Sequence, residues 1–190
     1  METILNNYEN WAVENNELLS KLVQGQSPEV LWIACSDSRV APNLQTKSEP
    51  GQLFVHRNIA NMLQMDDNSQ AVLEYAVEHL HVRHICIVGH QKCGGCMAAL
   101  EGNTQGSIHR WLAPLRKVVD NHRDELSSLT KEEKWDKVVE LNVIAQVNTI
   151  AQMHVVQEAW RHGQAIAIHG LVQSLVPGKM VDLGVTKEGL

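Results

Sequence analysis

Two short stretches hold the residues best suited to chemistry: CSDSR at residues 35–39 and GHQKCGG at residues 89–95. They contribute Cys35, His90 and Cys93, which are two thiols and one imidazole. Thiolate and imidazole groups suit Zn²⁺, and three protein ligands leave a fourth tetrahedral position open, as catalytic zinc requires. If the two stretches meet in the fold, they predict a catalytic zinc site.

Two further features of these stretches fit such a site. Asp37 and Arg39 are two residues apart, so in extended chain they share a side, and Arg39 would keep Asp37 ionised by a bidentate contact. An ionised Asp37 beside the open zinc position would accept a hydrogen bond from bound water. Gly94 and Gly95 follow Cys93 directly, where a substrate would reach the backbone and N–H groups opening a helix would hold an anion.

The other cysteines leave two alternative functions open. Cys96 could complete a closed Cys₃His structural zinc site with the three residues above, since the Cys-x-x-Cys spacing permits it. Cys93 and Cys96 could instead form the redox pair of a thiol–disulfide oxidoreductase. Cys86 lies within an apolar run and is interpreted as a core residue.

The composition limits the class of protein that carries these motifs. A chain of 190 residues, 44% apolar and 20% charged, fits one globular domain. The formal charge of −6 argues against a nucleic-acid partner, and no apolar run is long enough for a membrane span. Four cysteines favour a reducing compartment. The first twenty residues carry four glutamates and no basic residue, unlike a signal or transit peptide, so we expect a cytoplasmic location, or an organelle if a leader has been removed.

Apolar runs and periodic segments alternate along the chain. Four runs are typical of buried parallel strands, and three segments keep helical spacing. The expected strands are residues 30–35, 53–58, 84–90 and 165–172, and the expected helices cover residues 69–81, 108–119 and 141–151. This alternation predicts a single α/β domain with a mostly parallel central β-sheet flanked by helices. The PGK stretch at 177–179 is predicted to form a turn between two short terminal strands.

The expected sheet explains how the reactive residues would meet. Cys35 ends the first strand, and His90 and Cys93 lie at and just past the end of the third. Ligands of parallel α/β sheets gather beyond the carboxyl ends of the strands, so neighbouring first and third strands would bring the three residues together. Before the sheet, residues 4–22 are predicted to form one amphipathic helix, whose apolar stripe is interrupted only by Asn15. That stripe must be buried, and a partner subunit is one option.

The motifs CSDSR, HRNIAN and GHQKCGG, in this order and spacing, resemble those of the β-class carbonic anhydrases, and the similarity runs from GQSP at 25–28 to VDLGV at 181–185. The resemblance implies one zinc per subunit, held by Cys35, His90 and Cys93, and an Asp37–Arg39 dyad. It implies reversible hydration of CO₂ to bicarbonate and a proton by zinc-bound hydroxide. It also implies a homodimer, or a tetramer of dimers, in which residues 1–24 form a helical arm against the partner subunit.

The resemblance assigns further residues to the substrate pocket. Gln26 matches a glutamine whose amide reaches the pocket across the dimer interface, and Phe54 and Tyr75 match aromatic pocket positions. Backbone N–H groups near Gly94 and Gly95 would stabilise the negative charge that develops on CO₂. Some relatives hydrolyse carbon disulfide or carbonyl sulfide with the same metal set, and the motifs do not separate these substrates.

One part of the family pattern is missing. Trp32 and Arg57 match two residues of an inhibitory bicarbonate site known in some bacterial members, but Gln173 stands where the third, a tyrosine, would fall. The sequence therefore departs from that regulatory site.

Overall fold

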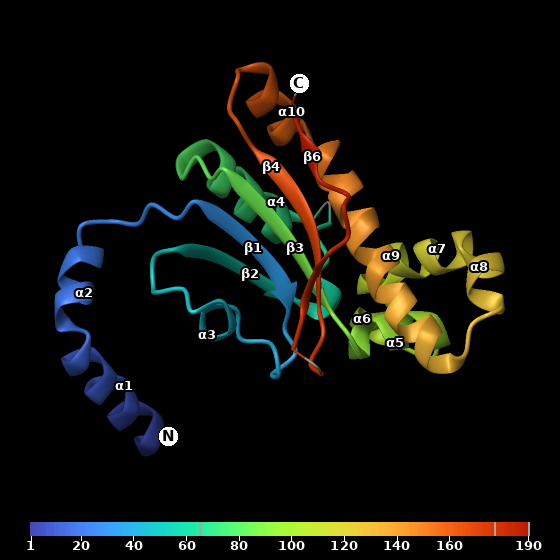
Figure 1. Cartoon of the computed structure of the whole chain (residues 1–190), viewed down its shortest axis with the longest axis horizontal. Coiled ribbons are helices and arrows are strands. Elements are labelled where there is room, and N and C mark those ends of the chain that lie inside the picture. Colours follow the sequence, from blue (N-terminus) through green and yellow to red (C-terminus); the bar gives the residue numbers. More distant parts are fainter. Residues whose placement is uncertain (65, 177, 190) are drawn as a thin grey trace.

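The computed structural model describes residues 1–64, 66–176 and 178–189. A twisted sheet lies at its centre, with strand order β2-β1-β3-β4-β5 and the short β6 also paired with β4 (Figure 1). The first four strands run parallel, and β5 and β6 run antiparallel to β4. The strands are β1 (Val30–Cys35), β2 (Leu53–Asn58), β3 (His84–His90), β4 (Ala167–Gln173), β5 (Met180–Asp182) and β6 (Lys187–Glu188).

The main core lies between the sheet and its covering helices. Leu31 and Ile33 of β1 and Ile85 and Ile87 of β3 point into this core, and all four are fully buried. The alternate residues of these strands form a smaller cluster on the opposite face, which includes the predicted core residue Cys86. Both faces of β1 and β3 are thus buried, which explains why these strands appear in the sequence as continuous apolar runs.

Helices of different lengths connect the strands. Early in the chain are α3 (Pro42–Thr46), the 3₁₀ turn η1 (Ile59–Asn61), α4 (Asp67–Glu74) and the π-helical turn η2 (Tyr75–His79). Between β3 and β4 come α5 (Gly94–Glu101), α6 (Gly106–Trp111), α7 (Ala113–Asn121), α8 (Arg123–Ser127), α9 (Lys131–Ala151) and α10 (His154–Arg161). The long helix α9 begins with a capping box formed by Thr130 and Glu133 and packs on β3 and β4.

The single-domain α/β architecture with a mostly parallel sheet is confirmed, and the first three strands have the predicted bounds. The fourth strand begins two residues later than predicted. The predicted helix at 108–119 is two helices that meet at Leu112, because Pro114 belongs in the first turn of a new helix.

The N-terminal arm consists of two helices rather than the one predicted. Helices α1 (Glu2–Glu14) and α2 (Asn16–Leu22) meet at Asn15, whose side-chain amide donates a 2.8 Å hydrogen bond to the backbone oxygen of Trp11. Both helices project away from the sheet (Figure 1). Ile4, Leu5 and Tyr8 are more than half exposed, so the apolar stripe of the arm is not buried within its own chain.

The end of the sheet corrects one prediction. The PGK stretch was expected between two short terminal strands, but Gly178 and Lys179 lie between β4 and β5, while Pro177 falls outside the described residues. The two short strands, β5 and β6, instead flank Gly184, whose φ of +67° forms the turn between them. In the described part of the chain, no helix is long and apolar enough to cross a membrane.

Buried His56 on β2 predicts a pH effect on stability. Burial lowers the pKa of this imidazole, and its Nε2 lies 3.1 Å from the amide nitrogen of Asn58, which requires the neutral ring as acceptor. The unfolded chain therefore binds this proton more readily, so folding stability falls as the pH drops below about 6.5. We expect His56→Gln to weaken this acid destabilisation. Urea unfolding at pH 7 and pH 5 measures it, and equal losses in both proteins would contradict the prediction.

Candidate metal centre

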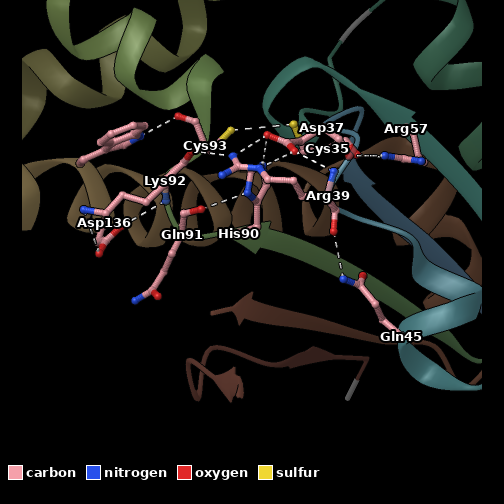
Figure 2. A network of polar contacts seen from close by, with 11 residues as sticks. Cys35, Asp37, Arg39, Gln45, Arg57, His90, Gln91, Lys92, Cys93 and Asp136 are labelled. Carbon is pink, nitrogen blue, oxygen red and sulfur yellow. Dashed lines mark hydrogen bonds and ion pairs between the residues drawn. The ribbon is translucent and has the colours of Figure 1, made fainter. Parts of the chain in front are cut away.

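Cys35, His90 and Cys93 meet at the carboxyl edge of the sheet. Because β1 and β3 are parallel neighbours, Cys35 and His90 end adjacent strands, and Cys93 follows as the N-cap of α5. The Sγ atoms of the two cysteines lie 3.8 Å apart, and the candidate ligand atoms of all three residues lie within 4.8 Å of one another. All three side chains are buried. Figure 2 shows them together with their polar contacts.

The chemistry of these donors fits zinc. His90 Nδ1 lies 3.1 Å from the backbone oxygen of Gln91, to which it donates, so its Nε2 presents a lone pair. That Nε2 atom is buried and has no hydrogen-bond partner among the described residues. Two thiolates on one tetrahedral zinc, with Zn–S bonds of about 2.3 Å, stand about 3.8 Å apart, which is the separation of the two Sγ atoms.

The two thiols hold their protons strongly until a cation replaces them. The contact with Cys93, followed by burial, raises the pKa of Cys35 to about 12. For Cys93, the contact with Cys35 favours the thiolate, but the contact with Cys96 and burial prevail and raise its pKa to about 12. Metal binding to this group must therefore release protons.

Asp37 and Arg39 form the predicted pair beside these donors. Arg39 Nε and Nη2 donate to the two carboxylate oxygens of Asp37 at 2.9 and 2.7 Å, and the Arg39 backbone N–H donates to Oδ1 at 3.0 Å. The hydrogen bond from the Arg39 side chain holds the pKa of Asp37 well below its usual range. Oδ2 of Asp37 lies 3.8 Å from Nε2 of His90. The structure therefore places an ionised carboxylate next to the donor group.

Arg57 supports the same strand end, a role that the sequence did not suggest. Its Nε donates to the backbone oxygen of Cys35 at 2.9 Å, and its Nη2 donates to that of Asp37 at 2.7 Å. The resemblance had matched Arg57 and Trp32 to a bicarbonate site. Gln173, at the expected tyrosine position, is paired with His90 in the sheet register, and its backbone oxygen accepts from Gln91 N at 2.9 Å.

Cys96 lies outside the donor group. It is fully buried in the first turn of α5, but the cluster of potential metal ligands among the described residues contains only Cys35, His90 and Cys93. This arrangement favours a three-ligand site with an open position over a closed Cys₃His site.

Gly94 and Gly95 differ in what surrounds them. A Cβ atom on Gly95 would lie 2.9 Å from Cγ2 of Ile59 and 3.0 Å from Cβ of Ala60, whereas a Cβ on Gly94 would meet nothing within 4 Å. Gly95 thus allows η1 to pack against the start of α5, and Gly94 leaves the surface beside Cys93 open.

This difference predicts unequal effects on stability. We expect Gly95→Ala to lower the free energy of unfolding by about 1–3 kcal/mol, because Ile59 and Ala60 must shift. Gly94→Ala is the matched control and should change stability by less than about 1 kcal/mol. Denaturant unfolding of both variants measures the difference. Equal effects in the two variants would contradict the packing argument.

The other predicted pocket residues are not brought to this centre within one chain. Phe54 and Tyr75 lie together, with ring centroids 5.8 Å apart. In β2, Asn58 is paired with Cys35, whereas Phe54, four residues earlier, is paired with Leu31. Phe54 therefore lies roughly 13 Å along the strand from the level of Cys35. Gln26 precedes the start of β1, at the same far end of the sheet.

The fold and site define an α/β protein with a Cys-His-Cys donor group at the carboxyl edge of a parallel sheet. Residues 30–180 match the family model described as carbonic anhydrase. The chain is 40% identical over 176 residues to a carbonic anhydrase of Emericella nidulans, covering 92% of this chain and 77% of that one. It is 32% identical to a carbonic anhydrase of Candida albicans, covering 91% of this chain but 62% of that relative.

Solved structures give the same result. A β-carbonic anhydrase of Sordaria macrospora, described as tetrameric, superimposes with a TM-score of 0.92 and 38% identity, covering 98% of each chain. A Coccomyxa β-carbonic anhydrase in complex with acetazolamide gives a TM-score of 0.91 and 37% identity, covering 99% of this chain and 86% of that one. The chain belongs to the β-carbonic anhydrase family and is an enzyme of the carbonic anhydrase class.

Proposed function

We propose that this chain is a zinc enzyme that catalyses CO₂ + H₂O ⇌ HCO₃⁻ + H⁺. The observation that carries the proposal is the buried Cys35–His90–Cys93 donor group with the ionised carboxylate of Asp37 beside it. Zinc bound by these three residues would lower the pKa of a water molecule, so that hydroxide is available near neutral pH.

Asp37 would act as a hydrogen-bond acceptor in this reaction. Arg39 keeps its carboxylate ionised and fixes both oxygens, so the carboxylate can accept a proton in a hydrogen bond and orient the attacking oxygen toward CO₂. Negative charge then develops on the CO₂ oxygens. The N–H groups that open α5 beside Gly94 are the nearby donors suited to stabilise it.

The proposed active unit contains more than one copy of the chain. Gln26, Phe54 and Tyr75 lie far from their own donor group, so they would serve the pocket of a second copy. The arm of residues 1–24, with its exposed apolar stripe, would pack against that copy. The tetrameric description of the Sordaria macrospora relative supports an oligomer, either a homodimer or a tetramer of dimers. Four free cysteines support a cytoplasmic location.

The test is stopped-flow CO₂ hydration by the zinc-loaded protein. We expect one zinc per chain and a rate that rises from pH 6 to pH 9. Thiolates at Cys35 and Cys93 would carry as much negative charge as Zn²⁺ carries positive charge, so they acidify bound water less than three neutral imidazoles would. A flat profile would contradict this charge argument. Hydrolysis of carbon disulfide or carbonyl sulfide without CO₂ hydration would overturn the proposed substrate.

A further inference from the structure

The loop between the donors His90 and Cys93 is held by the first turns of α9. Trp135 Nε1 donates a 2.7 Å hydrogen bond to the backbone oxygen of Cys93. Asp136 Oδ1 accepts from the backbone N–H of Lys92 at 3.3 Å, and its Oδ2 lies 3.8 Å from the Lys92 ammonium. That ammonium also lies 5.2 Å from the centroid of the Trp135 ring. Two neighbouring residues of α9 thus contact two successive residues of the loop, more than forty positions away.

This loop needs such support because its backbone is unfavourable. Lys92 has a φ of +56°, in the left-handed region that residues with a Cβ rarely adopt. The turn at Lys92 brings Cys93 back towards the end of β3, so that its sulfur faces His90 and Cys35. Strained backbone of this kind persists only where the surrounding contacts determine it. Here those contacts come from Trp135 and Asp136.

The same loop is also tied to the Asp37–Arg39 pair. Arg39 Nη2, which donates to Asp37, also donates to the backbone oxygen of Lys92 at 3.2 Å. The backbone N–H of Lys92 is therefore held by Asp136, and its backbone carbonyl is held by Arg39 (Figure 2). Any shift of the loop would move the carbonyl that helps to orient the guanidinium, and with it the carboxylate of Asp37.

We propose that Trp135 and Asp136 are positioning residues for the metal centre, which fix Cys93 directly and Arg39 through Lys92. The inference rests on the proposed zinc function, but it concerns residues outside the predicted site. Outer contacts that orient metal ligands typically change metal affinity or activity by about 10–100-fold when they are removed. A purely structural role for Trp135 would change thermal stability without accelerating the release of metal.

Trp135→Phe provides the test, because it keeps an aromatic ring and removes the N–H donor. Trp160→Phe is a matched control: Trp160 Nε1 donates to the backbone oxygen of Ile166 at 2.9 Å, on α10 and away from the donor group. Zinc release from the full-length, zinc-loaded proteins is followed with an excess of a chromogenic chelator. We expect release to be roughly 10-fold faster or more in Trp135→Phe and to change less than about twofold in Trp160→Phe.

A second variant tests the contact to Lys92 separately from the contact to Cys93. It also keeps the inference testable if Trp135→Phe does not fold. Asp136→Ala removes the acceptor for Lys92 N–H, so we expect faster zinc release together with a lower kcat at full zinc occupancy. Wild-type release rates in both Trp135→Phe and Asp136→Ala would overturn the inference, even if the wild type binds zinc and hydrates CO₂. Failure of the wild type to bind zinc would instead overturn the proposed function.

Discussion

Cys93→Ser is expected to lower the rate of CO₂ hydration at least roughly a thousand-fold, because water that is not activated by zinc has a pKa near 15.7 rather than 7. The Sγ atom of Cys93 lies 3.8 Å from that of Cys35 and belongs to the buried donor group with His90. A serine hydroxyl is a poor zinc ligand and leaves two donors. The variant should therefore also lose zinc, which metal analysis after exhaustive dialysis measures.

Cys96→Ser is the matched control for this loss. Cys96 is equally buried, three residues further along the same chain segment, but it is not part of the donor group. We expect Cys96→Ser to keep one zinc per chain and most of its activity. Loss of zinc in both variants would instead support a closed Cys₃His site, and retention of zinc by Cys93→Ser would contradict the assigned donor set.

The sequence was sufficient to predict the strands that carry the site, for a physical reason. Strands β1 and β3 are buried on both faces, so they are continuous apolar runs that end at Cys35 and His90. Their parallel pairing follows from the helices between them, and this pairing brings the two ends together. Helix ends were less predictable. The break at Asn15 depends on one side chain bonding to the backbone, and periodicity does not reveal this.

The contacts around the donor group were not predictable. Trp135 lies 42 residues from Cys93, and the packing of α9 on β3, β4 and α5 brings its indole to the Cys93 carbonyl. Gly89 offers a partial signal, because a Cβ there would lie 2.8 Å from Val139 and Val143, so a glycine marks where α9 approaches the strand. Arg57 was matched to a bicarbonate site by resemblance, whereas its guanidinium in this chain holds the backbone of Cys35 and Asp37.

Arg39→Ala is expected to lower CO₂ hydration by about 10–100-fold while the zinc content stays at one per chain. The guanidinium makes two hydrogen bonds to the Asp37 carboxylate, and without them that carboxylate is free to rotate. Its Oδ2 is already 3.8 Å from His90 Nε2, so a small rotation would bring it to the open position of a bound zinc. The carboxylate would then block that position instead of orienting the attacking oxygen.

Two control variants isolate this role. Arg39→Lys keeps the positive charge but loses the planar, bidentate contact with the Asp37 carboxylate. Its activity should therefore fall between those of the wild type and Arg39→Ala. Arg123→Ala removes a comparable arginine–aspartate contact with Asp120, at 2.7 Å on the exposed surface, and should leave activity unchanged. Measurements of kcat/KM and zinc content decide the matter. Full activity in Arg39→Ala would contradict the assigned role of Arg39, because Asp37 would then work without the contact that fixes its carboxylate.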